Sequence, residues 1–490
     1  MPAAPVPPCG AALLLGCRPM RISALAAAAL GGTALLAATP ERPLSPETAR
    51  AATEIVKKAL AGTGTAGIAT SLTDRAGPRL AGSPGDTAAV AWGLETLRAL
   101  HFADVRAEEA PVHVWKRRSE SGEVVLPWAQ PLALTALGGS VATPESGLEA
   151  DVLEVSSLED LDARGEAARG KIVFFDGAMR RGRQMSGYGE AVVVRTHGAS
   201  RAARYGALGV LIRSIGTDHD RFPHTGGVDY DDGTPKIPAA ALAVPDAEML
   251  TRLGRLGPAR VRFRLDCGDE GMGKSANVIG EISGAGKPNE IVLLGAHLDS
   301  WDLGRGAIDD AAGCAAVIEA ARLAREASPP PARTIRVVLF ANEENGGGGA
   351  KAYASEHAAE LPAHAAALEA DSGSGAPLEL SWLAGPSAEP ALRALAAILE
   401  PTGAGSLHGG GDGGADVGVL RAAGVPLFSI SQDVSHYFDV HHTANDTAMQ
   451  LEPANLDRLT AAVAAFAYAA ASAPEPFERI PESLRVTPRR

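Results

Sequence analysis

The chain has 490 residues, of which 46% are hydrophobic and 21% charged, and its formal net charge is −13. This length is enough for two globular domains, or for one large domain with an insertion, and the composition excludes a disordered tail or a coiled coil. The acidic balance argues against a broad nucleic-acid surface, because such a surface needs clustered lysine and arginine. We therefore expect a globular protein that does not bind nucleic acid.

The first 38 residues have the layout of a secretory signal peptide. From Met20, the segment MRISALAAAALGGTALLAA has one basic residue, an apolar core and small residues at its end. Met20 is an alternative start, since the Pro-rich stretch MPAAPVPPCG lacks a basic start, and LLLGC, ending at Cys17, is an alternative lipoprotein cleavage site. A retained single-span anchor is a further interpretation, because the apolar stretch approaches the length that a bilayer requires. We expect an exported protein, periplasmic or secreted, whose mature chain has no stable membrane span, and lipoprotein anchoring stays open.

Helical spacing after this segment predicts helices over residues 45–60 and 87–100, and residues 104–116 are typical of a strand pair or one long strand. From about residue 122 to residue 264, short Val and Ile runs separated by Gly and Pro indicate a separate, mostly β module. The regular alternation then resumes, with strands over 291–296, 334–341, 365–370 and 425–430 and helices over 311–327, 350–361, 390–399 and 453–471.

This alternation predicts an α/β fold in which a mixed, mostly parallel sheet is sandwiched by helices. The main domain comprises residues 45–121 and 265–474, which flank the inserted β-rich module of residues 122–264, and residues 475–490 form a C-terminal tail. In such folds ligands bind outside the carboxyl ends of the strands. An exported chain would keep Cys267 and Cys314, which could pair but need not.

Side chains of metal-ligand type follow the predicted strands. In chain order they are His297 and Asp299, then Glu343 and Glu344, then Asp371, then His441 and His442, while Asp309 and Asp310 open the helix after the first of these strands. Imidazole and carboxylate together suit zinc, whereas an all-oxygen set would suggest magnesium or calcium. We predict two zinc ions with Asp309 bridging them, because two ions about 3.5–4 Å apart can stabilise both oxygens of a hydrolytic transition state.

Four of these segments, HLDSWDLGRGAIDD, ANEENGGGGAKAY, EADSG and YFDVHHT, resemble the motifs of a known family. They are similar to those of the zinc exopeptidases related to bacterial leucyl aminopeptidase, most closely the carboxypeptidase Q (plasma glutamate carboxypeptidase) branch. The resemblance covers the chain from about residue 45 to residue 471, including the insert, which resembles a protease-associated domain. It implies a zinc exopeptidase fold and hydrolysis of peptide bonds in dipeptides or short peptides.

The resemblance also implies a role for each ligand. His297 and Asp371 would bind one zinc, Glu344 and His442 would bind the other, and Asp309 would bridge them. The peptide bond after the bridging aspartate is cis in the family, so we expect a cis bond between Asp309 and Asp310.

Three further residues receive roles by the same resemblance or from their chemistry. Glu343 would be the general base, taking a proton from a metal-bridging water. Asp299 would orient the imidazole of His297. Tyr437 is either a hydrogen-bond donor to the developing oxyanion or a core aromatic. The family pattern selects His442 as the ligand, so His441 is expected to serve packing.

Alternatives of other classes can be set against this interpretation. A single-zinc acyltransferase like the glutaminyl cyclases would use one metal, and a non-catalytic receptor of the same fold would have lost ligands.

The glycine-rich loop of residues 403–418 is either a substrate-facing loop or a surface segment, and His219 and His224 are expected to be structural or exposed. The end of the peptide that is recognised and the formation of a homodimer stay open.

Overall fold

The computed structural model describes residues 44–486, so the predictions for residues 1–38 lie outside the described residues. Within them the strands form a 14-stranded mixed sheet. The strands that surround the predicted site are β8 (Arg260–Ile282), β9 (Lys287–His297), β10 (Arg333–Phe340), β11 (His364–Glu369), β12 (Pro377–Leu383), β13 (Ser406–Gly409) and β14 (Leu427–Gln432).

The centre of this sheet is parallel. Strands β10, β9, β11 and β14 lie side by side in that order and run in the same direction. Antiparallel strands adjoin them, β8 beside β10 and β12 beside β14. The predicted mixed, mostly parallel sheet is therefore confirmed in this region, and the carboxyl ends of its central strands meet at one edge.

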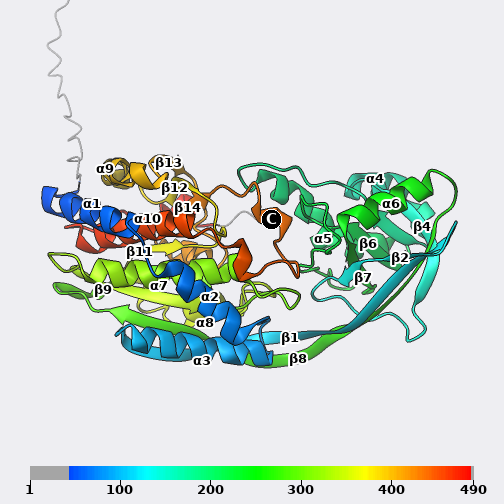
Figure 1. Cartoon of the computed structure of the whole chain (residues 1–490), viewed down its shortest axis with the longest axis horizontal. Helices are drawn as coiled ribbons and strands as arrows, with labels where there is room; N and C mark the ends of the chain where they lie inside the picture. The colour runs from blue at the N-terminus through cyan, green and yellow to red at the C-terminus, as the bar shows by residue number, and fades with distance from the viewer. Residues whose placement is uncertain (1–43, 487–490) are drawn as a thin grey trace, which may run out of the picture. The chain divides into compact units, whose positions relative to one another are not determined.

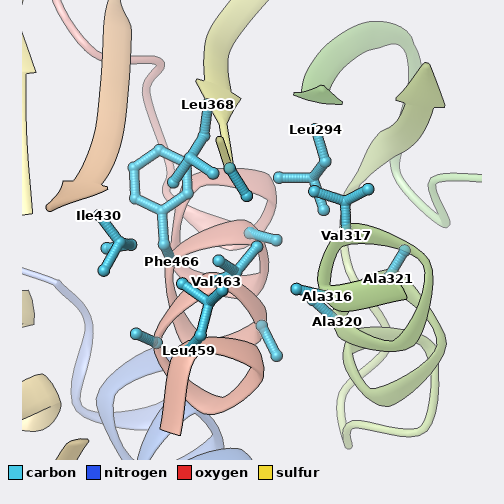
Figure 2. Packing of buried hydrophobic residues seen from close by; sticks show 14 of the residues in the cluster. Leu294, Ala316, Val317, Ala320, Ala321, Leu368, Ile430, Leu459, Val463 and Phe466 are labelled. Carbon is cyan, nitrogen blue, oxygen red and sulfur yellow. The ribbon is translucent and has the colours of Figure 1, made fainter. Parts of the chain in front are cut away.

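Helices cover both faces of the sheet, as predicted. They are α1 (Pro46–Leu60), α2 (Thr65–Ala76), α3 (Pro84–Ala99), α7 (Ala312–Arg325), α8 (Gly348–Glu356), α9 (Glu389–Leu399) and α10 (Pro453–Ser472). Successive side chains of a strand point to opposite faces. Accordingly Leu294 of β9 enters the core that contains α7 and α10, whereas Leu293 enters the core beneath α8. Figure 2 shows Leu294 packed with residues of the first of these cores, among them Val317 and Phe466.

The insert is joined to the main domain by two long strands, β1 (Ala103–Leu126) and β8, which pair antiparallel along most of their length (Figure 1). The predicted domain boundaries at residues 122 and 264 therefore fall inside continuous strands. The remaining insert elements are β2 (Gln130–Leu132), β3 (Leu134–Ala136), β4 (Leu148–Val155), α4 (Leu158–Arg164), β5 (Ile172–Phe175), α5 (Ser186–Arg204), β6 (Gly209–Arg213), β7 (Ala239–Leu242) and α6 (Val244–Gly254).

The insert is not mostly β, because three helices accompany its strands. The longest, α5, contains the run Val192 to Val194. Val193 of this run is 41% exposed, whereas Val194, Ala199 and Ala202 pack against or into the core of the insert. Small residues at helical spacing thus decide the local structure, and a short apolar run does not distinguish a strand from a helix.

Sequence periodicity missed α2 and the strands β12 and β13. Helix α2 has the sequence TAGIATSLTDRA, rich in Thr and Ala, and is held by burial of Ala69 and Leu72 rather than by a strong helical pattern. Cys267 and Cys314 are both buried and free, so the two do not pair. In the described part of the chain, no helix has the length and apolar character that a membrane span requires.

Candidate metal centre

The predicted ligands lie where the parallel strands end. His297 is the last residue of β9, Asp371 comes two residues after β11, and Glu344 follows β10. Because these strands are parallel neighbours, residues far apart in the sequence reach the same edge of the sheet. Burial of His297 and Asp309 places the centre of this cluster away from bulk water.

One group of candidate ligands consists of His297, Asp309 and Asp371. His297 Nε2 lies 3.1 Å from Asp309 Oδ1 and 3.7 Å from Asp371 Oδ1. All three donors therefore face a common point, as a shared cation would require. These are the residues to which the sequence assigned the first zinc and its bridge.

A second group forms around the other oxygen of Asp309. His442 Nε2 lies 3.3 Å from Asp309 Oδ2 and 3.1 Å from Glu344 Oε2. His441 Nε2 is 3.5 Å from the same Asp309 oxygen, and Asp309, His441 and His442 form a compact set of possible ligands. The two histidine rings stack with centroids 3.5 Å apart. His441 thus lies among the donors, where sequence reasoning expected a packing role.

Asp299 contacts both halves of the site. Its backbone carbonyl lies 3.2 Å from Nδ1 of His297, whereas its carboxylate lies 3.7 Å from that nitrogen. The carboxylate instead accepts hydrogen bonds from the backbone N–H groups of Glu343 at 3.0 Å and Glu344 at 3.4 Å. The residue therefore orients the imidazole through its main chain and positions the two glutamates through its side chain.

Supporting residues hold the turn that carries Asp309. The Asp309–Asp310 peptide bond is cis, as expected. Asp310 accepts hydrogen bonds from the N–H of His297 at 3.2 Å and of Gly313 at 2.9 Å. Asp446 accepts at 2.8 Å from each of the two N–H groups immediately before Asp309, and the buried Arg79 donates to the carbonyls of residues 298 and 306. Sequence reasoning assigned no role to Asp446 or Arg79, since neither lies in a ligand position of a recognised motif.

Burial and neighbouring charges shift the proton affinities of the site. Although burial lowers the pKa of His297, the nearby carboxylates of Asp299, Asp309 and Asp371 raise it well above its ordinary value. Burial raises the pKa of Asp309, but hydrogen bonds from His297 and His442 hold it well below the usual range. Burial also raises the pKa of Glu343 well above its ordinary value, and the Glu344 carboxylate adds to this shift.

These residues fit a divalent metal. Oε1 of Glu344 is buried without a hydrogen-bond partner, which leaves a carboxylate oxygen available for a ligand. Imidazole nitrogens and carboxylate oxygens together are the donor set of zinc. A cation at the two groups around Asp309 would supply the positive charge that the buried carboxylates require.

A cavity of about 210 Å³ opens onto this cluster. Its wall includes Glu343, which belongs to neither of the compact ligand groups, and Tyr437. Burial raises the pKa of Tyr437 well above its ordinary value, and the neighbouring carboxylates add to the shift, so the phenol keeps its proton. A protonated phenol that faces the cavity can donate a hydrogen bond.

The insert also lines the cavity, through Met185, Tyr188, Arg195 and Gly227. Sequence reasoning missed all four, because no motif or periodicity connects a helix of the insert with a site some hundred residues further along the chain. The glycine-rich loop of residues 403–418 does not contribute to this wall. Its His408 is exposed and its Asp416 is buried beside Glu369, whose carboxylate accepts the Asp416 N–H at 2.9 Å.

Comparisons with known proteins show the family of this chain. Residues 277–467 match the model of peptidase family M28. Carboxypeptidase Q from Mus musculus is 35% identical over 410 residues, which cover 83% of this chain and 86% of that protein. The crystal structure of a peptidase M28 precursor from Shewanella amazonensis SB2B superposes with a TM-score of 0.86 at 42% identity, covering 89% of this chain and 99% of that one. A zinc aminopeptidase from Bacillus subtilis shares the fold, with a TM-score of 0.57 at 21% identity, covering 85% of this chain and 95% of that one. The chain therefore belongs to peptidase family M28, with carboxypeptidase Q among its relatives.

Proposed function

We propose that the protein is a zinc exopeptidase that hydrolyses dipeptides or short peptides and holds two metal ions, which share Asp309. The observation that carries this proposal is the position of the Asp309 carboxylate, with Oδ1 facing His297 and Oδ2 facing His442. A single-zinc enzyme of the glutaminyl cyclase type would not need donors on both sides of this carboxylate. A receptor without catalysis would not need the complete donor set.

His297 and Asp371 would hold one zinc, and Glu344 and His442 the other, with His441 next to the second position. Zinc at these positions would act as a Lewis acid, polarising the scissile carbonyl and making water easier to deprotonate.

Glu343 would take a proton from the attacking water and return it to the leaving amine. Its place on the cavity wall, outside both ligand groups, leaves its carboxylate free for this task. Asp299 would keep Glu343 in place through the hydrogen bond to its backbone N–H. Tyr437, with its proton retained, would donate a hydrogen bond to the oxyanion that develops as water attacks.

The free carboxyl end of the substrate would pair with Arg195. Its Nε is buried without a hydrogen-bond partner, and its Nη2 donates to the hydroxyl of Tyr188 at 2.8 Å. A Cβ at Gly226 would lie 2.4 Å from Nη1, so this glycine gives the guanidinium its space. A buried guanidinium without an anionic partner is unfavourable, and a carboxylate is the anion that its planar fork matches. The name of the relative carboxypeptidase Q agrees with recognition of this end.

The test is a panel of one dipeptide in free, N-acetylated and C-amidated forms, assayed with the parent and with Arg195→Gln. Amidation should lower kcat/KM of the parent by roughly 10- to 100-fold, as expected for the loss of a hydrogen bond to a charged group. Arg195→Gln should lower kcat/KM for the free dipeptide similarly and leave the amide almost unchanged. Arg213→Gln is the matched control, because Arg213 pairs with Asp176 in the same insert and does not line the cavity.

Different outcomes would contradict different parts of the proposal. Loss of activity on N-acetylation but not on amidation would identify an aminopeptidase and remove the role of Arg195. Efficient internal cleavage of casein, with peptides blocked at both ends accepted as readily as free dipeptides, would contradict an exopeptidase.

A further inference from the structure

The loop that carries Tyr437 and His442 is held by the insert from outside the cavity. Insert residues bond to its main chain at several points: Thr217 N–H donates to Phe438 O at 3.0 Å, and Val434 N–H donates to Arg183 O at 3.2 Å. The Thr217 hydroxyl donates to Asp439 at 2.8 Å. The position of this loop therefore depends on residues more than 200 positions earlier in the chain.

At His442 the contact with the insert involves the candidate ligand itself. The Thr225 N–H donates to His442 O at 3.1 Å, and Nδ1 of His442 lies 3.2 Å from Thr225 O. A carbonyl can only accept, so Nδ1 must carry the proton in this hydrogen bond. Nε2 faces Asp309 and Glu344, and in the neutral imidazole it carries the lone pair that a metal would use. The insert thus selects the tautomer that can bind a metal.

Next to Thr225, His224 supports the same turn. Its ring is 1% exposed, and its Nδ1 lies 2.7 Å from His441 O. Its Nε2 lies 2.8 Å from Oδ1 of Asp218. The imidazole thus joins Asp218 to the main chain beside His442. A Cβ at Gly216 would lie 2.3 Å from Nε2, so this glycine makes room for the ring.

We propose that His224 and Asp218 are positioning residues for the metal ligand His442, so that the insert sets the zinc affinity of one of the two metal positions. This inference rests on the proposed function. It differs from the expectation that His224 is merely structural or exposed, because the contacts of His224 continue directly into the ligand loop.

The other metal position has no comparable support from the insert. The Nδ1 partner of His297 is the carbonyl of Asp299, and the N–H of His297 donates to Asp310. Both partners belong to the main domain. Loss of the His224 contacts should therefore weaken zinc binding in one step and leave the other step unchanged.

The test measures zinc binding to the folded full chain by competition with a chromophoric chelator, and resolves two binding steps. His224→Leu, which removes both side-chain hydrogen bonds, should weaken one step by roughly 10- to 100-fold, the usual effect of losing a partner that orients a ligand. The other step should stay within about twofold of the parent value, because the His297 group keeps its orienting partners.

His364→Leu is the matched control. His364 is equally buried, and its Nε2 forms a hydrogen bond of 2.9 Å with the hydroxyl of Tyr353. It is the first residue of β11, whereas Asp371 follows the other end of this strand. This substitution should lower the melting temperature of the zinc-free protein while both zinc affinities stay at the parent level. A role of His224 in fold stability alone would give the same pattern in His224→Leu and would overturn the proposal.

A second pair of variants keeps the test decisive if His224→Leu does not fold. Asp218→Leu removes the acceptor of Nε2 and should reproduce the loss in one binding step. Asp218→Asn keeps an oxygen acceptor and should retain most of the affinity. Parent-like zinc binding in Asp218→Leu would overturn the proposal. A single zinc step in the parent would instead contradict the two-metal function.

Discussion

The carboxylates around the cavity differ in their hydrogen-bond and ion-pair partners, and these partners decide which role each carboxylate can take. The Asp309 carboxylate faces a histidine on each side, and the Asp299 carboxylate is occupied by two backbone N–H groups. Glu343 and Glu344 both line the cavity, but Glu344 also contacts a candidate ligand, with its Oε2 3.1 Å from Nε2 of His442. Adjacent glutamates in the sequence, Glu343 and Glu344, thus receive different roles from their surroundings.

Glu343→Gln should retain bound zinc and lose most of the reaction rate, because it removes the proton acceptor without removing a ligand. We expect kcat to fall by at least about 100-fold, within the range found for general bases. The measurement is kcat on a free dipeptide together with zinc content by elemental analysis. Glu356→Gln, an exposed glutamate on the helix that follows, is the control and should behave like the parent. Near-parent hydrolysis by Glu343→Gln would show that another group is the base.

Helix α8 illustrates how an element is fixed to the sheet by charge as well as by its apolar face. Tyr353 of this helix is buried in the core beneath it and contacts Arg336 of β10 through its hydroxyl at 3.0 Å. Beyond the helix, Glu360 accepts from Arg336 at 2.6 Å and pairs with His357 at 2.9 Å. These bonds connect the segment after α8 to the strand that leads to Glu343.

This network predicts a pH dependence of stability. Although burial raises the pKa of Glu360, hydrogen bonds and charge from Arg336 and His357 lower it to about 2, below the ordinary value of 4.5. A carboxyl whose pKa is lower in the folded state stabilises the fold above its unfolded pKa, and this contribution is lost as pH falls from 4.5 towards 2.

Glu360→Gln should therefore lower the free energy of unfolding by about 1 kcal/mol at pH 7, a value reduced because the side chain is 37% exposed. The difference from the parent should shrink at about pH 3, where the parent carboxyl is partly protonated. Urea unfolding of zinc-free protein at both pH values measures this. Glu389→Gln, which breaks an exposed pair with Arg393, should change little at either pH. If the difference in free energy of unfolding between Glu360→Gln and the parent is the same at pH 7 and pH 3, the lowered pKa of Glu360 is contradicted.

At the scale of the whole molecule, metal binding and folding are linked. The donors of the proposed metal positions come from separate strands and loops, so they are close together only in the folded chain. A ligand that binds the folded state alone stabilises it, by about 2.7 kcal/mol at 100 times its dissociation constant. The site should therefore contribute to the stability of the protein that contains it.

Purified protein should contain close to two zinc ions per chain, and chelation should abolish peptide hydrolysis and lower the melting temperature by several degrees. The measurements are elemental analysis, an activity assay and thermal unfolding before and after chelation. Asp309→Ala, which removes the carboxylate shared by both positions, should bind little zinc. Chelation should therefore cause no further loss of activity and no further fall in its melting temperature. One tightly bound metal with full activity would favour the single-zinc alternative.

The sequence by itself determined the architecture of the main domain and predicted a set of candidate ligands at one edge of its sheet. The periodicity of apolar residues predicts long amphipathic helices and buried strands. The observed bounds of α1, α7, α10 and β9 lie within a few residues of the predicted bounds. His297, Asp309 and Asp371 were predicted as ligands because they follow strand ends in the order of a known family. In this region local pattern and global fold agree.

Only the tertiary structure decided which other residues meet this site. Helix α5 brings Arg195 to the cavity, and the carbonyl of Thr225 fixes the tautomer of His442. The first depends on how the insert packs, and the second is a backbone contact that leaves no signature in residue type. Periodicity reports which face of an element is buried, but not which distant segment covers it, because that choice is made by packing between residues far apart in the chain.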